Sequence, residues 1–326
     1  MILAGDIGGT KINLALFTLK NNTLHLTIKH QFLSRNFKNF NDVILEFMKL
    51  TKITKVTRAS LAIAGPIINQ TCKTTNLPWE ISAKKLQDEF DIKKVILLND
   101  LEATAFGMLH LKDNEFINLN LNATPTDANK GVIAAGTGLG EAMLYFDGKH
   151  YFPTASEGGH SDFAPNSKQQ DKLLVWLRIK FGSHISYERI LSGSGIFTLY
   201  EFLVDCNYAP QPTKIIQAQQ DEDKSALISE CAIEDSDKLC CETLRLFCEI
   251  YGAEAGNLAL KTLSLGGIFI GGGIAPKILP FMQDGTFMYA FVNKGRFKKL
   301  LENMEVKISL NDETALLGAA YFISQD

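Results

Sequence analysis

The sequence predicts an α/β protein of two domains, and three observations support this prediction. The chain has 326 residues, more than a single hydrophobic core usually serves. Apolar runs with the alternation of strands are interspersed with segments of helical spacing. Two glycine-rich turns, at residues 5–11 and 136–140, each lie between strand-like runs. The second half of the chain therefore repeats the opening of the first, which indicates an internal duplication.

The opening turn, Gly5 to Lys11, reads Gly-Asp-Ile-Gly-Gly-Thr-Lys. Glycines let backbone approach a ligand closely, and successive N–H groups can form an anion-binding nest. The Asp6 carboxylate would repel a phosphate there unless a cation lay between them, so the pattern suggests bound Mg²⁺. The alternative is an ordinary glycine-rich hairpin with a solvated aspartate. This turn alone does not decide between the two interpretations.

Composition narrows the class of protein. The net charge is −3 and the chain has no block of Lys and Arg, so nucleic acid is not the expected partner. The six cysteines show no C-x₂-C spacing, which disfavours zinc and disulfide frameworks and favours free thiols in a reducing compartment. No apolar stretch has the pattern of a signal peptide or of a membrane span. We therefore expect a cytoplasmic protein with no membrane partner.

Polar residues follow a buried strand predicted over residues 93–98. Asn99 and Asp100 come directly after it, at the strand end where open α/β sheets bind ligands. A helix is predicted over residues 101–110, so Asp100 could instead be its N-cap, although this leaves Asn99 without a role. Asn76, in the loop ahead of Trp79, could line a polar cleft, but by itself it more readily fits a cap for a helix starting near Ser82.

The second glycine turn, Gly136 to Gly140, follows a strand predicted over residues 131–135. A dinucleotide-binding motif would need a helix after the glycines. Instead, two strand-like runs follow, joined by Asp147-Gly148, which is a hairpin signal. The two glycine turns could hold a polyphosphate from both sides.

Three further motifs could bind a small polar ligand. Glu157-Gly-Gly-His160 is a tight turn suited to a ligand rich in hydroxyls, although a lone histidine is usually structural. Glu188 is predicted on a helix over residues 184–193, where it could simply be solvated. The glycines 271–273 follow a strand predicted over residues 268–270 and could lie against a flat base or simply form a tight turn. The last helix is predicted over residues 313–324, capped by Asp312.

Taken together, eight separated segments resemble bacterial glucokinases of the hexokinase/actin superfamily, in that family's order. They are Gly5-Asp-Ile-Gly-Gly-Thr10, Leu61-Ala-Ile-Ala-Gly-Pro66, Thr75-Asn-Leu-Pro-Trp79, Leu98-Asn-Asp100, Gly136-Thr-Gly-Leu-Gly140, Ser156-Glu-Gly-Gly-His160, Ser186-Tyr-Glu-Arg-Ile-Leu-Ser-Gly193 and Gly271-Gly-Gly-Ile274. The resemblance implies two ribonuclease-H-like α/β domains, with mixed sheets flanked by helices and a cleft between them. It places residues 1–110 plus about 303–326 in a small domain and about 111–302 in a large one. It also implies a cytosolic homodimer.

The resemblance further implies ATP-dependent phosphorylation of glucose at its 6-hydroxyl, the first step of glycolysis, with Mg²⁺ as cofactor. Asp100 would be the general base, and Asp6 would act through Mg²⁺. Glucose would be held by Asn76, Asn99, Asp100, Glu157, His160 and Glu188. ATP would be held by Gly5, Asp6, Ile7, Gly8, Gly9, Thr10, Gly136, Thr137 and Gly138, with Gly271, Gly272 and Gly273 bordering the adenosine.

Two positions depart from the family pattern. Ser194 stands where the family often has proline, which could loosen the loop after Glu188, and Glu141 places an unexpected charge after the second glycine turn. The cysteine-rich zinc motif of the related ROK kinases and repressors is absent. The alternatives to glucose phosphorylation are a kinase for mannose or an N-acetylated hexose, and a sugar-sensing regulator on the same scaffold.

Overall fold

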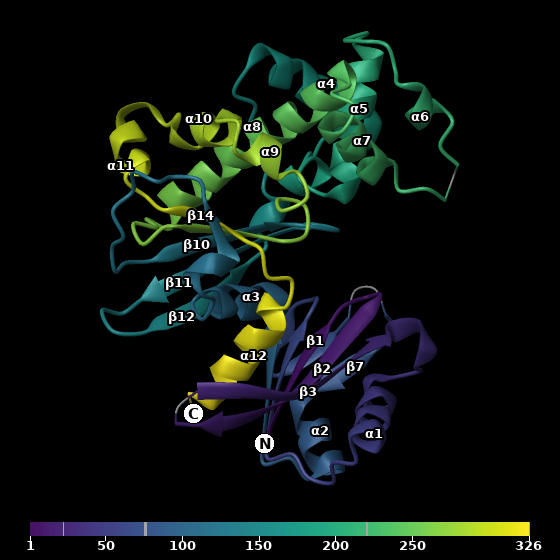
Figure 1. Ribbon diagram of the computed structural model, residues 1–326, viewed down its shortest axis with the longest axis vertical. Coiled ribbons are helices and arrows are strands. Elements are labelled where there is room, and N and C mark those ends of the chain that lie inside the picture. Colours follow the sequence, from purple (N-terminus) through teal and green to yellow (C-terminus); the bar gives the residue numbers. More distant parts are fainter. Residues whose placement is uncertain (22, 75–76, 220, 326) are drawn as a thin grey trace. The chain divides into compact units, whose positions relative to one another are not determined.

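The computed structural model describes residues 1–21, 23–74, 77–219 and 221–325 (Figure 1). The chain divides into two compact units. Unit 1 comprises Met1–Glu115, Tyr151–Ala155 and Asn311–Asp326, and unit 2 comprises Phe116–His150 and Ser156–Leu310. Unit 1 is thus assembled from segments near both ends of the sequence.

A five-stranded mixed sheet forms the centre of unit 1 in the described part of the chain, with the strand order β3-β2-β1-β4-β8. Its strands are β1 (Ile2–Ile7), β2 (Lys11–Lys20), β3 (Thr23–Leu33), β4 (Arg58–Ile63) and β8 (Lys94–Asn99). β1 pairs antiparallel with β2 and parallel with β4, and β4 pairs parallel with β8. The predicted strand–turn–strand at the first glycine motif is therefore confirmed. A separate small sheet joins β5 (Ile67–Ile68), β6 (Thr71–Lys73) and β7 (Glu80–Ser82).

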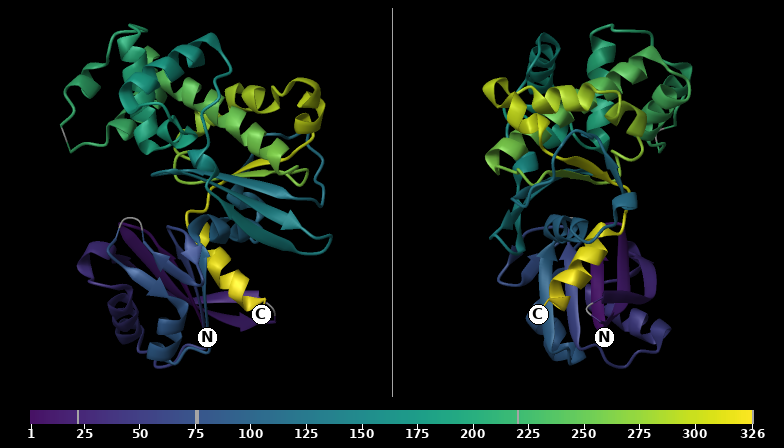
Figure 2. Two further views of the ribbon diagram at one scale, coloured as in Figure 1. Left: turned by 180° about the vertical axis from the view of Figure 1, so that it is seen from behind. Right: turned by 60° about the vertical axis from the view of Figure 1, so that its left-hand side comes forward.

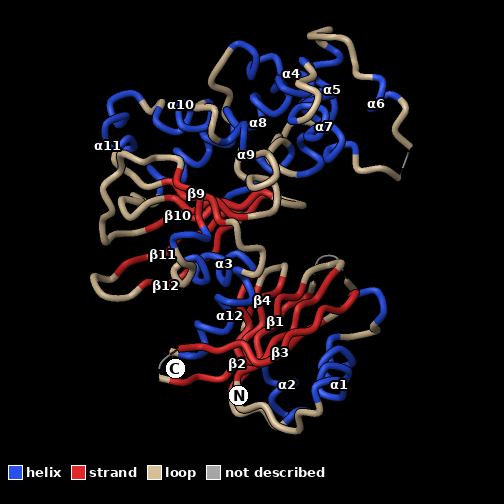
Figure 3. The backbone as a smooth tube through the Cα atoms, viewed as in Figure 1, coloured by secondary structure: helices blue, strands red, loops and turns tan. Residues whose placement is uncertain are grey.

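Helices cover both faces of the five-stranded sheet (Figure 3). Alternate side chains of a strand point to opposite faces, and β1 shows this directly. Leu3 packs in a core with residues of α1 (Phe40–Thr51) and α2 (Ala83–Phe90), whereas Ile2 packs in another core with residues of α3 (Asp100–Met108) and α12 (Thr314–Ser324). Both faces are apolar because both are buried, which is typical of parallel strands in α/β folds.

α3 and α12 pack backbone against backbone. A Cβ on Gly318 would lie 1.8 Å from the Ala103 carbonyl oxygen, so no larger residue fits at the crossing. The helix predicted over residues 313–324 is confirmed as α12. Asp312 as its cap is wrong: the helix begins at Thr314, and the Asn311 side chain instead accepts a hydrogen bond from the Glu313 N–H, at 2.8 Å.

Unit 2 is built on a six-stranded mixed sheet with the strand order β12-β11-β10-β13-β14-β9, again counting only the described residues; all of these strands lie in unit 2 except β12, most of which is grouped with unit 1. Its strands are β9 (Phe116–Asn118), β10 (Lys130–Ala135), β11 (Leu139–Phe146), β12 (Tyr151–Ser156), β13 (Ile268–Gly271) and β14 (Val306–Ser309). β10 is antiparallel to β11 and parallel to β13. The second glycine motif therefore also lies between antiparallel strands, as predicted.

Helices of unit 2 gather on one side of this sheet (Figure 2). They are α4 (Lys168–Phe181), α5 (Gly193–Asp205), α6 (Thr213–Ile216), α7 (Lys224–Ile233), α8 (Lys238–Lys261), α9 (Leu279–Met282), α10 (Thr286–Val292) and α11 (Lys298–Glu302). α8 is largely buried and is tied to β10 by Tyr251, whose hydroxyl accepts from the Ala135 N–H at 3.2 Å and donates to the Ile133 carbonyl at 3.3 Å. The strand that leads into the second glycine turn is therefore fixed from the core side.

Candidate active site

The carboxyl ends of three parallel strands meet at one edge of the unit 1 sheet. Ile7 of β1 is in register with Ile63 of β4, and Ile63 is in register with Asn99 of β8. The loops that follow these strands therefore emerge side by side, which is where α/β sheets place ligands. They carry the first glycine turn and the Asn99-Asp100 pair.

Ser34 anchors the first glycine turn, and the sequence analysis did not identify it. Its hydroxyl donates to the Gly8 carbonyl and its backbone N–H donates to the Thr10 carbonyl, both at 3.0 Å. Ser34 is completely buried. The turn is closed within itself by a 3.0 Å hydrogen bond from the Gly8 N–H to the Lys11 carbonyl. Ser34, which directly follows β3, therefore fixes the conformation of the first glycine turn.

Asp6 lies on β1 at this turn and is largely withdrawn from water. Burial raises the pKa of its carboxyl, and a 3.5 Å hydrogen bond from the Asn13 amide lowers it in part. A cation next to such a carboxylate would offset the cost of its burial. The described residues contain no cluster of three or more acidic, His or Cys side chains able to hold a metal. Asp6 therefore fits Mg²⁺ that is bound mainly by substrate phosphates and waters, the usual arrangement for this ion.

Asn99, and not Asp100, is the N-cap of α3, so the capping alternative for Asp100 is wrong. The Asn99 side-chain oxygen accepts from the Leu101 N–H at 2.9 Å, and Glu102 completes the capping box by accepting from the Asn99 N–H at 3.0 Å. The Asn99 amide also donates to the Gly65 carbonyl at 3.2 Å. Asn99 thus has the structural role that the sequence analysis could not assign.

Asp100 is the first residue of α3, and its carboxylate accepts from the Leu101 N–H at 3.0 Å. A helix N-terminus favours negative charge through its free N–H groups and its dipole. Asn76, the other sugar-binding residue predicted in this part of the chain, lies outside the described residues. Trp79, which follows it, is buried and packs near Phe40, with ring centroids 6.5 Å apart.

In unit 2, the second glycine turn is held from two directions. The Gly136 N–H donates to the Gly138 carbonyl at 2.8 Å, and the Gly193 N–H at the start of α5 donates to the Gly136 carbonyl at 2.8 Å. On the far side of the turn, the Leu139 N–H donates to Glu188 Oε2 at 3.0 Å. Thr137 lies between the glycines at the tip, so its position is set by backbone contacts on both sides.

Glu188 lies in a single 3-10 turn, Tyr187–Arg189, and the helix predicted over residues 184–193 is wrong. An isolated bridge between Ser186 and Asp162 holds the preceding chain extended, and α5 begins only at Gly193. The turn brings Glu188 Oε2 so close to Gly138 that a Cβ there would be 2.4 Å away. Glu188 is therefore packed against the second glycine turn.

His160 lies next to Glu188 and follows Glu157 in the predicted polar turn. Gly158–His160 is a 3-10 turn closed by a hydrogen bond of 3.0 Å from the His160 N–H to the Glu157 carbonyl. The His160 Nε2 and Glu188 Oε1 atoms are 3.7 Å apart, and the His160 side chain is 61% exposed. A structural histidine would be buried in the core with its ring nitrogens hydrogen-bonded, and the exposure of His160 does not fit that alternative. The structure thus brings two of the predicted sugar-binding residues together beside a predicted phosphate turn.

The third glycine motif lies against the second. Gly271 ends β13 in register with Ala134, and Gly272 has a φ of +80° with its Cα packed on the Ala135 carbonyl. A side chain at Gly272 would be both strained and blocked. Two of the three glycine motifs predicted to contact nucleotide are therefore neighbours at the carboxyl edge of the parallel pair β10 and β13.

Ser194 does not loosen a loop, and that expectation is wrong. It lies in the first turn of α5, where Ser192 is the N-cap and accepts from the Gly195 N–H at 3.1 Å. The Ser194 and Ser192 hydroxyls are 3.2 Å apart, within hydrogen-bonding distance. Glu141, the other departure, is 2% exposed and packs beneath the Glu157–His160 turn.

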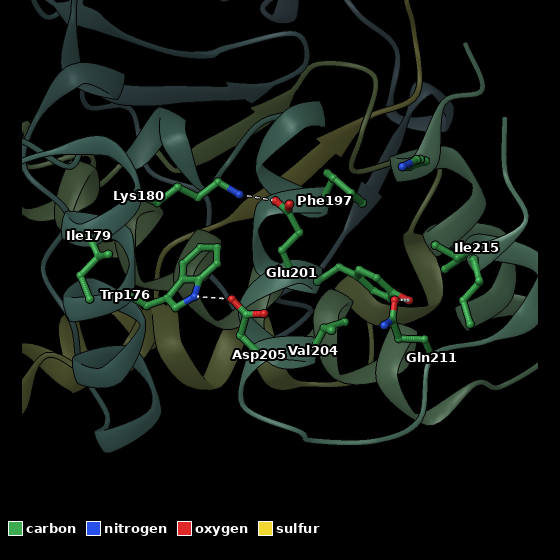
Figure 4. A pocket seen from close by; sticks show the side chains of 12 residues that line it. Trp176, Ile179, Lys180, Phe197, Glu201, Val204, Asp205, Gln211 and Ile215 are labelled. Carbon is green, nitrogen blue, oxygen red and sulfur yellow. Dashed lines mark hydrogen bonds and ion pairs between the residues drawn. The ribbon is translucent and has the colours of Figure 1, made fainter. Parts of the chain in front are cut away.

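A separate hollow of about 730 Å³ lies among α4, α5 and α6 (Figure 4). Its polar side chains largely satisfy one another: the Trp176 indole N–H donates to Asp205 at 2.8 Å, and Lys180 pairs with Glu201 at 2.5 Å. None of the predicted site residues that the structure describes lines it. Among the described residues, no helix is both long and apolar enough to cross a membrane.

Several solved structures with this fold are sugar kinases, and one is a ROK family transcriptional regulator. The chain superposes on the crystal structure of a glucokinase from an Antarctic psychrotroph with a TM-score of 0.87 and 30% identity, covering 100% of this chain and 99% of that one. It also matches the fold of a ROK family glucokinase from Streptomyces griseus, solved in complex with glucose and AMPPNP, with a TM-score of 0.68 and 18% identity, covering 100% and 99%. The fold is thus that of a two-domain, actin-like sugar kinase, as the sequence predicted.

Sequence comparison identifies the family. The glucokinase family model matches residues 3–326. The curated glucokinase of Nostoc punctiforme is 41% identical over 98% of this chain and 98% of its own length. The chain belongs to the glucokinase family, and the resemblance drawn from the eight motifs is confirmed.

Proposed function

We propose that this protein transfers the terminal phosphoryl group of ATP to the 6-hydroxyl of glucose, with Asp100 as general base. The proposal agrees with the family and with the ligands, glucose and AMPPNP, of the related Streptomyces griseus structure. The observation that carries it is the position of Glu188, which contacts the second glycine turn with one carboxylate oxygen and faces His160 with the other.

In this proposal, the polar turns of unit 2 bind the sugar. Glucose is a neutral polyol, so a good site offers both hydrogen-bond donors and acceptors. Glu157 and Glu188 would accept from sugar hydroxyls and His160 would donate or accept. Asn99, whose side-chain oxygen is engaged by α3, would contribute its remaining amide N–H, and Asn76 would lie near the sugar. A sugar lacking a hydroxyl would leave one of these groups unpaired, at a cost of about 1–3 kcal/mol.

Phosphoryl transfer depends mainly on positioning and charge neutralisation. The residues 5–10 and 136–138 would hold the phosphates through backbone N–H groups, and the glycines 271–273 would border the adenosine. Mg²⁺, held by ATP and through Asp6, would neutralise the charge that builds up on the phosphoryl oxygens. Asp100 would take the 6-hydroxyl proton, and such a base contributes about 10²–10⁴-fold to the rate.

The deciding experiment is a coupled assay of the pure protein with Mg²⁺-ATP and a panel of hexoses, reporting kcat/KM for each. We expect glucose to give the highest value, and we expect chelation of Mg²⁺ by EDTA to abolish turnover. Mannose or N-acetylglucosamine exceeding glucose would assign the enzyme to another hexose. No phosphorylated product from any hexose would reject kinase activity.

The sugar-sensing regulator is the less favoured function. The net charge of −3 opposes binding to DNA. Our proposal for the kinase also includes location in the cytoplasm, assembly as a homodimer and a role in glycolysis. DNA binding that weakens steeply with salt would favour the regulator, and sedimentation of a monomer at micromolar concentration would refute the dimer.

A further inference from the structure

Glu141 of β11 lies directly beneath the turn that carries Glu157 and His160. A Cβ built on Gly158 would be 2.1 Å from Glu141 Oε2, so the carboxyl group fills the space that a side chain would need. The same strand position is tied to the turn through backbone: Ser156 Oγ donates to the Glu141 carbonyl at 3.0 Å and accepts from the Gly158 N–H at 3.2 Å. Any displacement of Glu141 is therefore transmitted to the turn.

Glu254 of α8 faces Glu141 and is completely buried. Of the two acids, Glu254 has the larger number of polar partners. Asn257 donates to its Oε2 at 2.8 Å, Lys261 pairs with its Oε1 at 3.3 Å, and the Tyr187 hydroxyl also bonds to it. Tyr187 immediately precedes Glu188, so Glu254 supports the second of the two polar turns.

Glu141 has the opposite environment. Its Oε1 atom is buried and has no hydrogen-bond partner among the described residues. A buried acceptor without a donor costs free energy, and two adjacent buried carboxylates repel each other. Both problems disappear if Glu141 carries a proton and donates it to Glu254.

We propose that Glu141 and Glu254 form a buried carboxyl pair, sharing one proton, that positions the Glu157–His160 turn and Glu188 for sugar binding. This inference rests on the proposed function. Glu141 and Glu254 are positioning residues and touch neither substrate. The pair joins β11 to α8 directly beneath both turns, which no local sequence motif indicates.

The pair makes sugar binding sensitive to alkaline pH. Burial and then the charge of Glu254 raise the pKa of Glu141 to about 8, and Lys261 lowers it in part. The other titratable or charged groups facing the pair are Lys294, Tyr187 and Tyr251. The pKa values of both tyrosines are raised by burial, so the hydroxyls stay protonated and do not compete in this range. Above pH 8, two carboxylates would face each other under Gly158 and displace the turn.

The test is the pH dependence of glucose affinity in the wild type and in Glu141→Gln, which keeps the size and a donor but cannot ionise. Apparent affinity scales with the fraction of protein in the competent state. We therefore expect KM for glucose to rise about tenfold between pH 7 and pH 9 in the wild type, with kcat changing much less. In Glu141→Gln, KM should stay flat over this range. Glu249→Gln is the matched control. Glu249 lies on α8, as Glu254 does, but is not part of the pair, so this variant should behave as the wild type.

Thermal unfolding gives a readout that does not depend on turnover. A folded pKa above the unfolded value stabilises fully below pH 4.5, and this stability is lost as pH rises through 8. Most of this loss falls between pH 4.5 and pH 8, so the melting temperature of the wild type should fall between pH 5 and pH 9 more than that of Glu141→Gln. If Glu141→Gln does not fold, Glu254→Gln serves instead, and it should reduce the alkaline loss and shift it to lower pH, because Glu141 keeps its burial but loses the facing charge. Equal alkaline losses of glucose affinity and of stability in wild type and variant would overturn the pair. Absence of kinase activity with the stability difference intact would overturn only the proposed function.

Discussion

His160 and Glu188 lie with Nε2 and Oε1 3.7 Å apart, although each belongs to a different 3-10 turn. The second oxygen of Glu188 accepts from the Leu139 N–H at 3.0 Å, next to the second glycine turn. One carboxylate therefore fixes the spacing between a polar turn suited to hydroxyls and a backbone turn suited to phosphate. In phosphoryl transfer this spacing matters, because small misplacements of the reacting groups lower the rate strongly.

Gly138→Ala should impair glucose binding more than stability. The new Cβ would lie 2.4 Å from Glu188 Oε2, which is the far end of a flexible side chain and can move away. Glu188 would then lose its contact with Leu139 and its place beside His160, so KM for glucose should rise about tenfold or more, equivalent to about 1.4 kcal/mol. Steady-state kinetics and thermal melting measure the two effects. A large loss of stability with unchanged KM would contradict the assigned role of Glu188.

Asp100→Asn should lower kcat about 10²–10⁴-fold, because the amide keeps the shape but cannot take the 6-hydroxyl proton. The fold should be kept, since Asn99 and Glu102 provide the cap of α3. Asp88→Asn, at an exposed position on α2, is the control and should leave kcat unchanged. Rapid-quench measurement of the chemical step decides the matter. Turnover of Asp100→Asn at the wild-type rate would remove Asp100 from the base role.

Ser34→Ala should destabilise unit 1 and weaken ATP binding. The Gly8 carbonyl would lose its hydroxyl donor in a buried place, at a cost of about 1–3 kcal/mol. Chemical denaturation measures the stability, and KM for ATP reports the glycine turn. Ser82→Ala is a matched control, because Ser82 precedes α2 without a side-chain capping hydrogen bond. If both variants behave alike, Ser34 does not anchor the turn.

Acid should weaken the fold through His110. Its ring stacks on Tyr321 with centroids 3.7 Å apart, its Nε2 has no hydrogen-bond partner within the described ranges, and burial lowers its pKa to about 4. The unfolded chain binds the proton near pH 6.5, so stability is complete above that pH and falls as the pH drops toward 4. Denaturant titrations at pH 7 and pH 5 should show a smaller loss in His110→Phe than in the wild type. The same loss in both would exclude His110 as the cause.

The sequence predicted both glycine hairpins because their information is local: apolar alternation on each side of a turn that only glycine-rich backbone accommodates. The cap of α3 could also have been predicted, because Asn99 and Glu102 have the spacing of a capping box. Asp100 was preferred as the cap because it is adjacent to Asn99 and is an equally good cap-forming residue. Residues 184–193 show helical spacing, yet a bridge to Asp162 and the cap at Ser192 override it. Ser34 contacts Gly8 and Glu254 faces Glu141, and both partners are distant in the sequence. A local sequence pattern cannot predict such contacts.

α12 has a consequence for how the chain matures on the ribosome. One of the two cores of unit 1 contains Ile2 and Ala4 from its first strand and Leu316 and Ala319 from this late helix. Translation delivers β1 well before α12, and most of unit 2 emerges between them. One apolar face of the unit 1 sheet therefore stays uncovered in the nascent chain until α12 leaves the exit tunnel. Exposed apolar surface of this kind is prone to aggregation, so we expect a holding chaperone to bind this face during synthesis.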